Sequence, residues 1–231
     1  MVGGDLSGRL AAVRGRIISA SEASGRDPNE VTLITVSKTH PAEVVDEVVI
    51  AGAQNLGENR VQEAKAKKPA IHAARWHLIG PLQRNKARAA LEVFDVIHTV
   101  DRLEIGDRLQ FLLEEHWPER VMEVLLEINV GSEPQKAGVV PADARELLET
   151  VCRHDRLAVT GIMAIPPFEA DPEASRPHYR GLRELRDRLQ DETGHALPEL
   201  SMGMSHDFEV AVAEGATLVR VGTAIFGPRG G

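Results

Sequence analysis

The sequence predicts an α/β protein: a single (β/α)8 TIM barrel that spans residues 1–231 as one domain, with an extra N-terminal helix. Three observations predict this fold. Eight short runs rich in Val, Ile and Leu alternate with longer helical patterns. The runs are continuously apolar, which is typical of a parallel sheet buried on both faces. The length also fits, because eight strands, eight helices and their connections need about 216 residues and the chain has 231.

Local signals predict each element in turn. The extra helix is expected at Leu6–Ser21, while Pro41 and Gly52 frame a later helix and Ser205 and Gly215 frame the last one. An open doubly wound sheet is the alternative, but it needs a Gly-rich turn after the first strand, and this chain has SKTH there. The strands are expected at Val31–Val36, Asn55–Gly57, Trp76–Ile79, Val96–Val100, Glu123–Val130, Thr160–Ile165, Leu200–Met202 and Thr217–Val221.

Composition and charge argue against several classes of protein. A net charge of −8 and an aromatic content of 3% do not suit nucleic-acid binding through a basic or stacking surface. No apolar run approaches the ~20 residues of a membrane span, and no signal peptide precedes the first strand, so we expect a cytoplasmic protein. A single cysteine, Cys152, and nine histidines without paired ligand spacing predict no metal site. Nothing resembles a dimerisation helix, so a monomer is expected.

Lys38 is the most informative residue, because active sites of (β/α)8 barrels lie at the carboxyl ends of the strands. It directly follows the first predicted strand. An amine held in a partly desolvated barrel mouth is nucleophilic toward carbonyl groups. The alternative for Lys38 is an ordinary surface charge. Three other lysines lie in a charged helical run, which we interpret as a solvated face: Lys65, Lys67 and Lys68.

A second group of residues follows the seventh and eighth strands, where barrels tend to bind phosphate. Gly222 lets the backbone approach a ligand closely, and Thr223 offers an N–H and a hydroxyl group. Ser201, and the amides near Ser205 at the start of a helix, are further possible donors. Each stretch alone is equally consistent with turn glycines and a helix cap. Because the two stretches end neighbouring strands, together they predict an anion site.

A lysine beside a phosphate site suggests a phosphorylated aldehyde held as a Schiff base, and pyridoxal 5′-phosphate (PLP) is the cofactor that fits. The alternative is an aldolase-type barrel, in which the lysine captures a sugar-phosphate carbonyl. Arg220 has the same strand parity as Gly222, so both face the same side. An arginine at the pyridine nitrogen can only donate a hydrogen bond, which makes the cofactor a weak electron sink. Otherwise Arg220 pairs with a barrel carboxylate such as Glu58.

The chain resembles the YggS/PROSC family of PLP homeostasis proteins, which are related to the N-terminal barrel of alanine racemase. Several blocks in one order carry the resemblance: VTLITVSKTHP, LGENRVQEAKAK, WHLIGPLQRNKAR, LEINVGSEPQKAGV, GIMAIPP and LSMGMSHDFEVAVAEGATLVRVGTAIFG. The resemblance implies that Lys38 carries PLP as an internal aldimine. It also implies that Arg220 approaches the pyridine nitrogen and that Asn59 lies near the ring hydroxyl. By the same resemblance, the phosphate is held by Ser201, Gly222 and Thr223.

Two functions follow from this resemblance. The first is a non-catalytic protein that buffers PLP or delivers it to apo forms of PLP-dependent enzymes. The second is an amino-acid racemase, which needs an acid or base on each face of the substrate carbon. In alanine racemase a tyrosine from a second domain serves one face, but the only tyrosine here, Tyr179, falls in a helical stretch far from any predicted strand end. We therefore expect the carrier, with the racemase as the alternative.

Two further patterns carry less weight. Ser205, His206 and Asp207 have the residue types of a hydrolase triad, but consecutive residues entering a helix point in different directions. His77 lies on the third predicted strand. It either lines the pocket or is a hydrogen-bonded core histidine, and the sequence does not choose between these.

Overall fold

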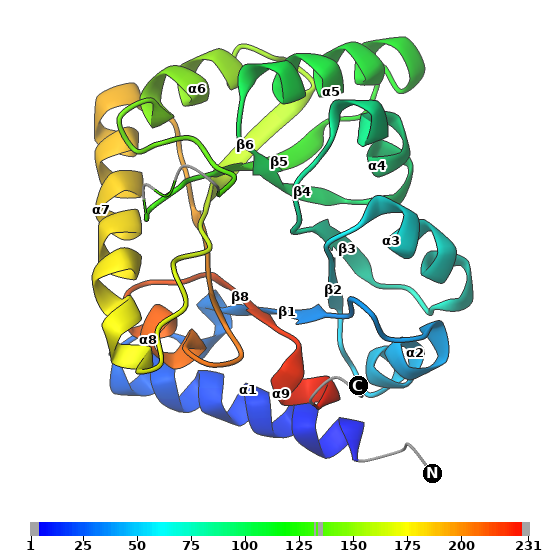
Figure 1. The fold of residues 1–231 in the computed structure, drawn as a ribbon, viewed down its shortest axis with the longest axis vertical. Coiled ribbons are helices and arrows are strands. Elements are labelled where there is room, and N and C mark those ends of the chain that lie inside the picture. Colours follow the sequence, from blue (N-terminus) through cyan, green and yellow to red (C-terminus); the bar gives the residue numbers. More distant parts are fainter. Residues whose placement is uncertain (1–4, 132, 134–135, 228–231) are drawn as a thin grey trace.

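A computed structural model describes residues 5–131, 133 and 136–227; the ends of the predicted domain, 1–4 and 228–231, and three positions of the LEINVGSEPQKAGV block lie outside them. Eight parallel strands close into a barrel in sequence order, and β8 pairs with β1 (Figure 1). This confirms the predicted (β/α)8 fold. The strands are β1 (Thr32–Val36), β2 (Asn55–Glu58), β3 (Arg75–Leu78), β4 (Val96–Val100), β5 (Met122–Glu127), β6 (Leu157–Met163), β7 (Glu199–Met204) and β8 (Leu218–Val221).

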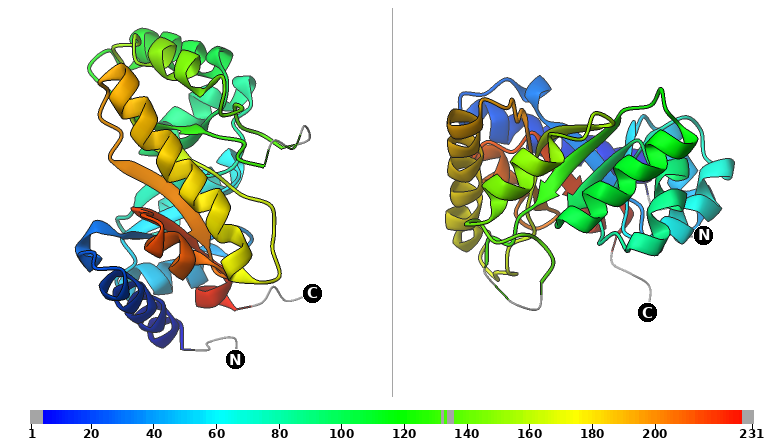
Figure 2. Two further views of the ribbon diagram at one scale, coloured as in Figure 1. Left: turned by 90° about the vertical axis from the view of Figure 1, so that its left-hand side faces the viewer. Right: turned by 90° about the horizontal axis from the view of Figure 1, so that it is seen from above.

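Helices surround the barrel on its outside, and the long helix α7 runs along one flank (Figures 1 and 2). The extra N-terminal helix is present and packs against α2, α8 and α9. The helix framed by Asp207 and Gly215 is followed by one more helical turn after β8, which the sequence signals did not predict. The helices are α1 (Leu6–Ala23), α2 (Ala42–Ile50), α3 (Val61–Lys67), α4 (Ala87–Val93), α5 (Leu103–His116), α6 (Ala144–Val151), α7 (Arg176–Thr193), α8 (Phe208–Ala213) and α9 (Thr223–Phe226).

The largest differences from the predicted strand limits occur on β5, β6 and β7. β6 begins three residues before the predicted Thr160, because its pairing with β5 starts at Leu157. The same pairing carries β5 only to Glu127, so the predicted continuation to Val130 is wrong. β7 runs on to Met204 rather than ending at Met202. Hydrogen-bonded neighbours therefore decide where these strands end, which hydropathy along one strand does not report.

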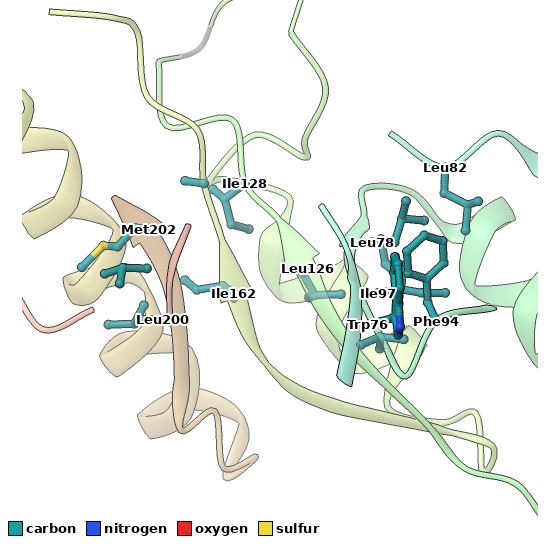
Figure 3. Packing of buried hydrophobic residues seen from close by; sticks show 14 of the residues in the cluster. Trp76, Leu78, Leu82, Phe94, Ile97, Leu126, Ile128, Ile162, Leu200 and Met202 are labelled. Carbon is teal, nitrogen blue, oxygen red and sulfur yellow. The ribbon is translucent and has the colours of Figure 1, made fainter. Parts of the chain in front are cut away.

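Two separate hydrophobic clusters stabilise the barrel. The larger one fills the space between the sheet and the helices, where Trp76 and Phe94 pack beside Leu78 (Figure 3). The smaller one lies inside the barrel and consists of Ile34, Val96, Leu125, Met163 and Leu218. Because side chains alternate between the two faces of a strand, the residues two positions further along these strands also face the interior. This parity decides which polar residues reach the mouth.

We predict opposite effects on stability for two glycine-to-alanine substitutions. A Cβ atom at Gly161 on β6 would lie 2.0 Å from the carbonyl oxygen of Glu199 on the paired strand. Gly161→Ala must therefore push the two strands apart, and we expect a loss of at least about 1–3 kcal/mol in the free energy of unfolding. Gly15 is exposed within α1 and its Cβ would meet no atom within 4 Å. Gly15→Ala should gain about 0.5–1 kcal/mol.

Urea unfolding of both variants tests this prediction. An unfolding midpoint of Gly161→Ala equal to that of the wild type would show that the close approach of β6 and β7 does not exist in solution.

Candidate functional site

The carboxyl ends of three adjacent strands bring together residues from both ends of the chain. Lys38 follows β1, Asn59 follows β2, and Gly222 follows β8. β1 pairs with both β2 and β8, so the three residues share one side of the barrel mouth. Lys38 is half-buried, and Thr39 after it has a φ of 68°, an uncommon value for a residue other than glycine. Backbone in this region is typical of functional turns.

A buried ionic network holds the turn that carries Lys38. The Nζ atom of Lys67 donates to Glu58 Oε1 at 2.7 Å, to the carbonyl of Ser37 at 2.8 Å and to Glu63 Oε1 at 2.7 Å. The hydroxyl of Ser37 donates to Glu58 at 2.8 Å. The amide of Thr39 donates to Glu63. One ammonium group therefore ties α3 to the ends of β1 and β2 and fixes the backbone on both sides of position 38.

At this network one expectation from the sequence is wrong, and one alternative does not hold. Lys67 does not belong to a solvated face, because it is only 7% exposed. Glu58 is fully buried and pairs with Lys67 rather than with Arg220. Burial raises the pKa of Glu58, against the opposing effects of Lys67 and Ser37. The helical run that contains Lys67 looks uniformly charged in sequence, so only its packing against β1 and β2 distinguishes this lysine from its neighbours.

The end of β8 forms a cradle of backbone amides. The N–H groups of Gly222 and Ala224 both point at the hydroxyl oxygen of Ser205, at 3.1 and 3.4 Å. Gly222 lies close to β1, since a Cβ atom there would be 3.1 Å from the carbonyl oxygen of Val36. Thr223 opens α9 and is exposed. Amides that converge on one oxygen are a suitable site for an anion.

The structure does not place Ser201 in this cradle. Ser201 pairs with Leu218, four residues before Gly222 on β8. Its hydroxyl lies inside the barrel, 3.0 Å from His98 Nδ1 and 2.6 Å from Arg220. Ser205 instead accepts the amides of Gly222 and Ala224. β7 extends two residues beyond its predicted end, so Ser205 rather than Ser201 lies just after the strand, and the role of Ser201 toward a phosphate stays a prediction.

Arg220 faces the barrel interior, as its parity predicted. It is 3% exposed, and its two terminal nitrogens donate to the hydroxyl of Ser201 at 2.6 Å and to the carbonyl of Ala164 at 2.9 Å. Burial lowers the pKa of Arg220, while Tyr179, Glu127 and Asp207 act in the opposite direction. Guanidinium remains protonated in proteins, so Arg220 is a fixed buried cation.

Tyr179 is closer to the strand ends than the sequence suggested. It points inward from α7, is 1% exposed, and lies near Asp207. Asp207 in turn accepts a hydrogen bond from the amide of Met204, the last residue of β7, at 2.9 Å. Burial and the Asp207 carboxylate raise the pKa of the Tyr179 phenol. The phenol is thus enclosed behind the site and does not open into the mouth.

Glu127 is a site residue that the sequence argument missed. It ends β5, which lies across the closed barrel from β1. The side chain is 5% exposed, and its Oε2 atom has no hydrogen-bond partner among the described residues. Burial, and after it the Asp101 carboxylate, raise the pKa of Glu127 to about 7 against the opposing effect of Arg220. The sequence signal that could have identified Glu127 is its position as a single acidic residue within the apolar run LLEINV.

The Ser205, His206 and Asp207 side chains point to three different partners. Ser205 receives the amides of α9, His206 lies 3.1 Å from the carbonyl of Ala170, and Asp207 binds the amide of Met204. They form no triad. Among the described residues, no group of three or more His, Cys, Asp or Glu side chains is arranged to hold a metal ion. Within the same part of the chain, no helix has the length and apolar character to cross a bilayer.

Comparison with known proteins assigns this barrel to a class and a family. The family model described as alanine racemase, N-terminal domain, matches residues 10–230, so the fold is that of the alanine racemase N-terminal domain. The pyridoxal phosphate homeostasis protein of Aquifex aeolicus is 46% identical over 223 residues, covering 96% of this chain and 97% of that protein. Its counterpart in Pseudomonas aeruginosa is 44% identical over 222 residues, covering 95% and 94%. The chain belongs to the family of pyridoxal phosphate homeostasis proteins, as its sequence motifs predicted.

Solved structures agree with this assignment. PipY of Synechococcus elongatus without PLP has a TM-score of 0.85 and 39% identity, covering 96% of this chain and all of that one. The structure of PipY with PLP bound has a TM-score of 0.83 and 38% identity, with the same coverage. Alanine racemase of Clostridium difficile has a TM-score of 0.73 at 14% identity, and this chain covers 57% of it. That last likeness concerns the fold alone.

We predict that the stability of the cofactor-free protein depends on the ionisation of Glu127. Its pKa is about 7 in the folded protein against an ordinary value of 4.5. Between these two values the folded state binds more protons than the unfolded chain, so the free energy of unfolding falls as pH rises through this window. Glu127→Gln should therefore match the wild type below pH 4.5 and exceed it by about 2–3 kcal/mol at pH 8.

Urea unfolding at pH 4 and pH 8 measures this difference. Glu123→Gln is the matched control, because Glu123 lies on the same strand but is half-exposed and paired with Arg75. If both variants changed with pH to the same extent, the assignment of the raised pKa to Glu127 would be wrong.

Proposed function

We propose that this chain binds PLP and takes part in intracellular PLP homeostasis, holding the cofactor on Lys38 and buffering it or delivering it to apo-enzymes. The observation that carries the proposal is that β1, which precedes Lys38, pairs with β8, which precedes the amide cradle at Gly222. Relatives that share the whole length of the chain are named pyridoxal phosphate homeostasis proteins, and PipY has a structure with PLP bound. We also propose that the chain forms a single domain and is monomeric.

The residues of the mouth fit the chemical groups of PLP. The cradle at Gly222 and Ala224 already receives an oxygen atom, that of Ser205, and so suits a phosphate oxygen. Thr223 adds an exposed hydroxyl. The Lys38 amine would add to the aldehyde carbon with loss of one water molecule, which forms a Schiff base without any oxidant or reductant. Asn59, at the end of the neighbouring strand, is proposed to lie near the ring hydroxyl.

Arg220 is proposed to serve the pyridine nitrogen. When bound, PLP supplies an electron sink whose strength depends on protonation of that nitrogen. Arg220 donates hydrogen bonds and does not release a proton, so it would hold the nitrogen in its unprotonated form. Its two terminal nitrogens are already engaged by Ser201 and Ala164. These two hydrogen bonds therefore hold the guanidinium in one orientation.

The enclosed Tyr179 favours binding without turnover over the racemase alternative. A racemase needs an acid or base on each face of the substrate carbon. Lys38 would serve one face, but the Tyr179 phenol is buried against Asp207 and does not reach the mouth. Glu127, buried at the end of β5, is the acid that we propose could serve the other face. Any racemase activity of this chain would therefore depend on both Lys38 and Glu127.

We predict that Lys38→Ala abolishes the covalent attachment of PLP. The wild type, incubated with PLP and passed through a desalting column, should keep a visible absorbance band and retain the cofactor after borohydride reduction. Lys38→Ala should lose both, while Lys65→Ala should keep them, because Lys65 is an exposed residue on α3. A wild type without the band, or a Lys38→Ala variant that keeps it, would contradict the proposal.

We further predict transfer of PLP without amino-acid turnover. The loaded protein should activate an apo-enzyme that depends on PLP, and the rate is compared with that of free PLP at the same concentration. Chiral chromatography after incubation with L-alanine and other amino acids should show no racemisation above the Lys38→Ala background. Racemisation that disappears in Lys38→Ala and in Glu127→Gln would establish the enzyme instead of the carrier.

A further inference from the structure

A chain of five polar side chains runs through the interior of the barrel. Arg220 NH1 lies 2.6 Å from Ser201 Oγ, which lies 3.0 Å from His98 Nδ1. His98 Nε2 lies 2.9 Å from His77 Nδ1, and His77 Nε2 lies 3.0 Å from Asn55 Oδ1. Asn55 and His77 border a cavity of about 180 Å³ at the amino end of the barrel. The chain therefore connects the two ends of the barrel.

The direction of every hydrogen bond in this chain follows from its two ends. Arg220 can only donate, and the oxygen of Asn55 can only accept, so His77 carries its proton on Nε2 and donates to Asn55. The bare Nδ1 of neutral His77 then accepts from Nε2 of His98, and the bare Nδ1 of His98 accepts from the hydroxyl of Ser201. Ser201, His98 and His77 each accept once and donate once along the chain, so both imidazoles are neutral Nε2–H tautomers.

The surroundings support neutral imidazoles. His98 is fully buried and His77 is 3% exposed. Burial, and after it the charge of Arg75, lower the pKa of His77 to about 3. The pKa of His98 also lies far below its ordinary value, because of burial first and then His77, Arg220 and Arg75. Both rings therefore remain uncharged across physiological pH.

Packing alone does not require a polar chain at this place. The adjoining interior cluster shows that this barrel fills its centre with apolar side chains. Well-packed apolar residues can replace buried polar groups at little cost in stability, while a partly satisfied polar network is costly. The hydrogen-bonded chain ends on Arg220, the side chain that is proposed to serve the pyridine nitrogen of the cofactor.

We infer that Asn55, His77, His98 and Ser201 act as positioning residues for Arg220. They form a one-directional hydrogen-bond relay that orients the guanidinium and keeps it a donor toward the ring of the bound cofactor. The role toward the ring rests on the proposed function, whereas the relay itself is a property of the cofactor-free protein. The two parts can therefore be tested separately.

The tautomers are tested first, on the cofactor-free protein. Long-range 1H–15N spectra of the histidine side chains, recorded from pH 5 to pH 8, distinguish protonated from bare ring nitrogens. His77 and His98 should both show a proton on Nε2 only, and neither should titrate. The same result is expected in Lys38→Ala, which cannot hold the cofactor covalently. A proton on Nδ1 of either ring, or titration within this range, would overturn the relay.

The positioning role is tested with two matched substitutions of His98. The oxygen of Asn can take the place of Nδ1, so His98→Asn keeps the acceptor for Ser201. The amide nitrogen of Gln can take the place of Nε2, so His98→Gln keeps the donor to His77 but leaves the hydroxyl of Ser201 without its acceptor. Asn is the smaller residue, so a merely structural role predicts greater damage in His98→Asn. The relay predicts the opposite order.

The expected results are specific to each variant. His98→Asn should bind PLP within about twofold of the wild type, with an unchanged absorbance maximum. His98→Gln and Ser201→Ala should bind about fivefold to tenfold more weakly and shift the maximum. Equal affinities for the two His98 variants, or weaker binding by His98→Asn, would overturn the positioning role. If the wild type bound no PLP while the tautomers were as expected, the proposed function would fail and the relay would stand.

Discussion

Closure of the barrel between β8 and β1 is the interaction on which the rest of the structure depends. The two strands pair in parallel from Thr32 with Leu218 to Thr35 with Val221. They come from opposite ends of the chain, so this pairing brings the turn that carries Lys38 to the same edge of the barrel as Gly222. The extra helix α1 packs against α2, α8 and α9 (Figure 1) and so lies over this seam. The helix that precedes the barrel therefore supports the contact that creates the site.

Buried charges hold this site in one geometry. Lys67 and Glu58 bind each other beneath the turn after β1, and Arg220 lies under the mouth with its bonds to Ser201 and Ala164. Burial of a charge costs several kcal/mol unless partners replace the lost water. Lys67, Arg220 and Glu58 Oε1 have such partners, while Glu58 Oε2 has none among the described residues. A buried ion pair adds little net stability. These charges instead fix the positions of the backbone and side chains around them, because a hydrogen-bonded network in a low-dielectric interior has few alternative arrangements.

Features that depend on a single strand were predicted well from the sequence. Features that depend on strand pairing or on the packing of helices were predicted less well. The barrel, the position of Lys38 and the parity of Arg220 follow from runs and spacing along the chain. The end of β7 was predicted two residues too early, because that end depends on pairing with β6 and β8. Lys67 and Tyr179 lie on helices whose packing against the sheet brings them to the site from far along the chain. Their environment is a property of tertiary structure, which local patterns do not record.

The arrangement of donors and acids favours retention of a cofactor over chemistry on it. In the proposed site, Lys38 would provide the covalent anchor and the amides of Gly222 and Ala224 the anionic one. Beneath them, Arg220 is a permanent donor that its partners hold in place. The phenol that a racemase would use on the far face is enclosed beside Asp207. A site with two anchors and an arginine rather than an acid at the ring nitrogen would stabilise a bound cofactor without promoting its reactions, which is why the proposed function is a carrier.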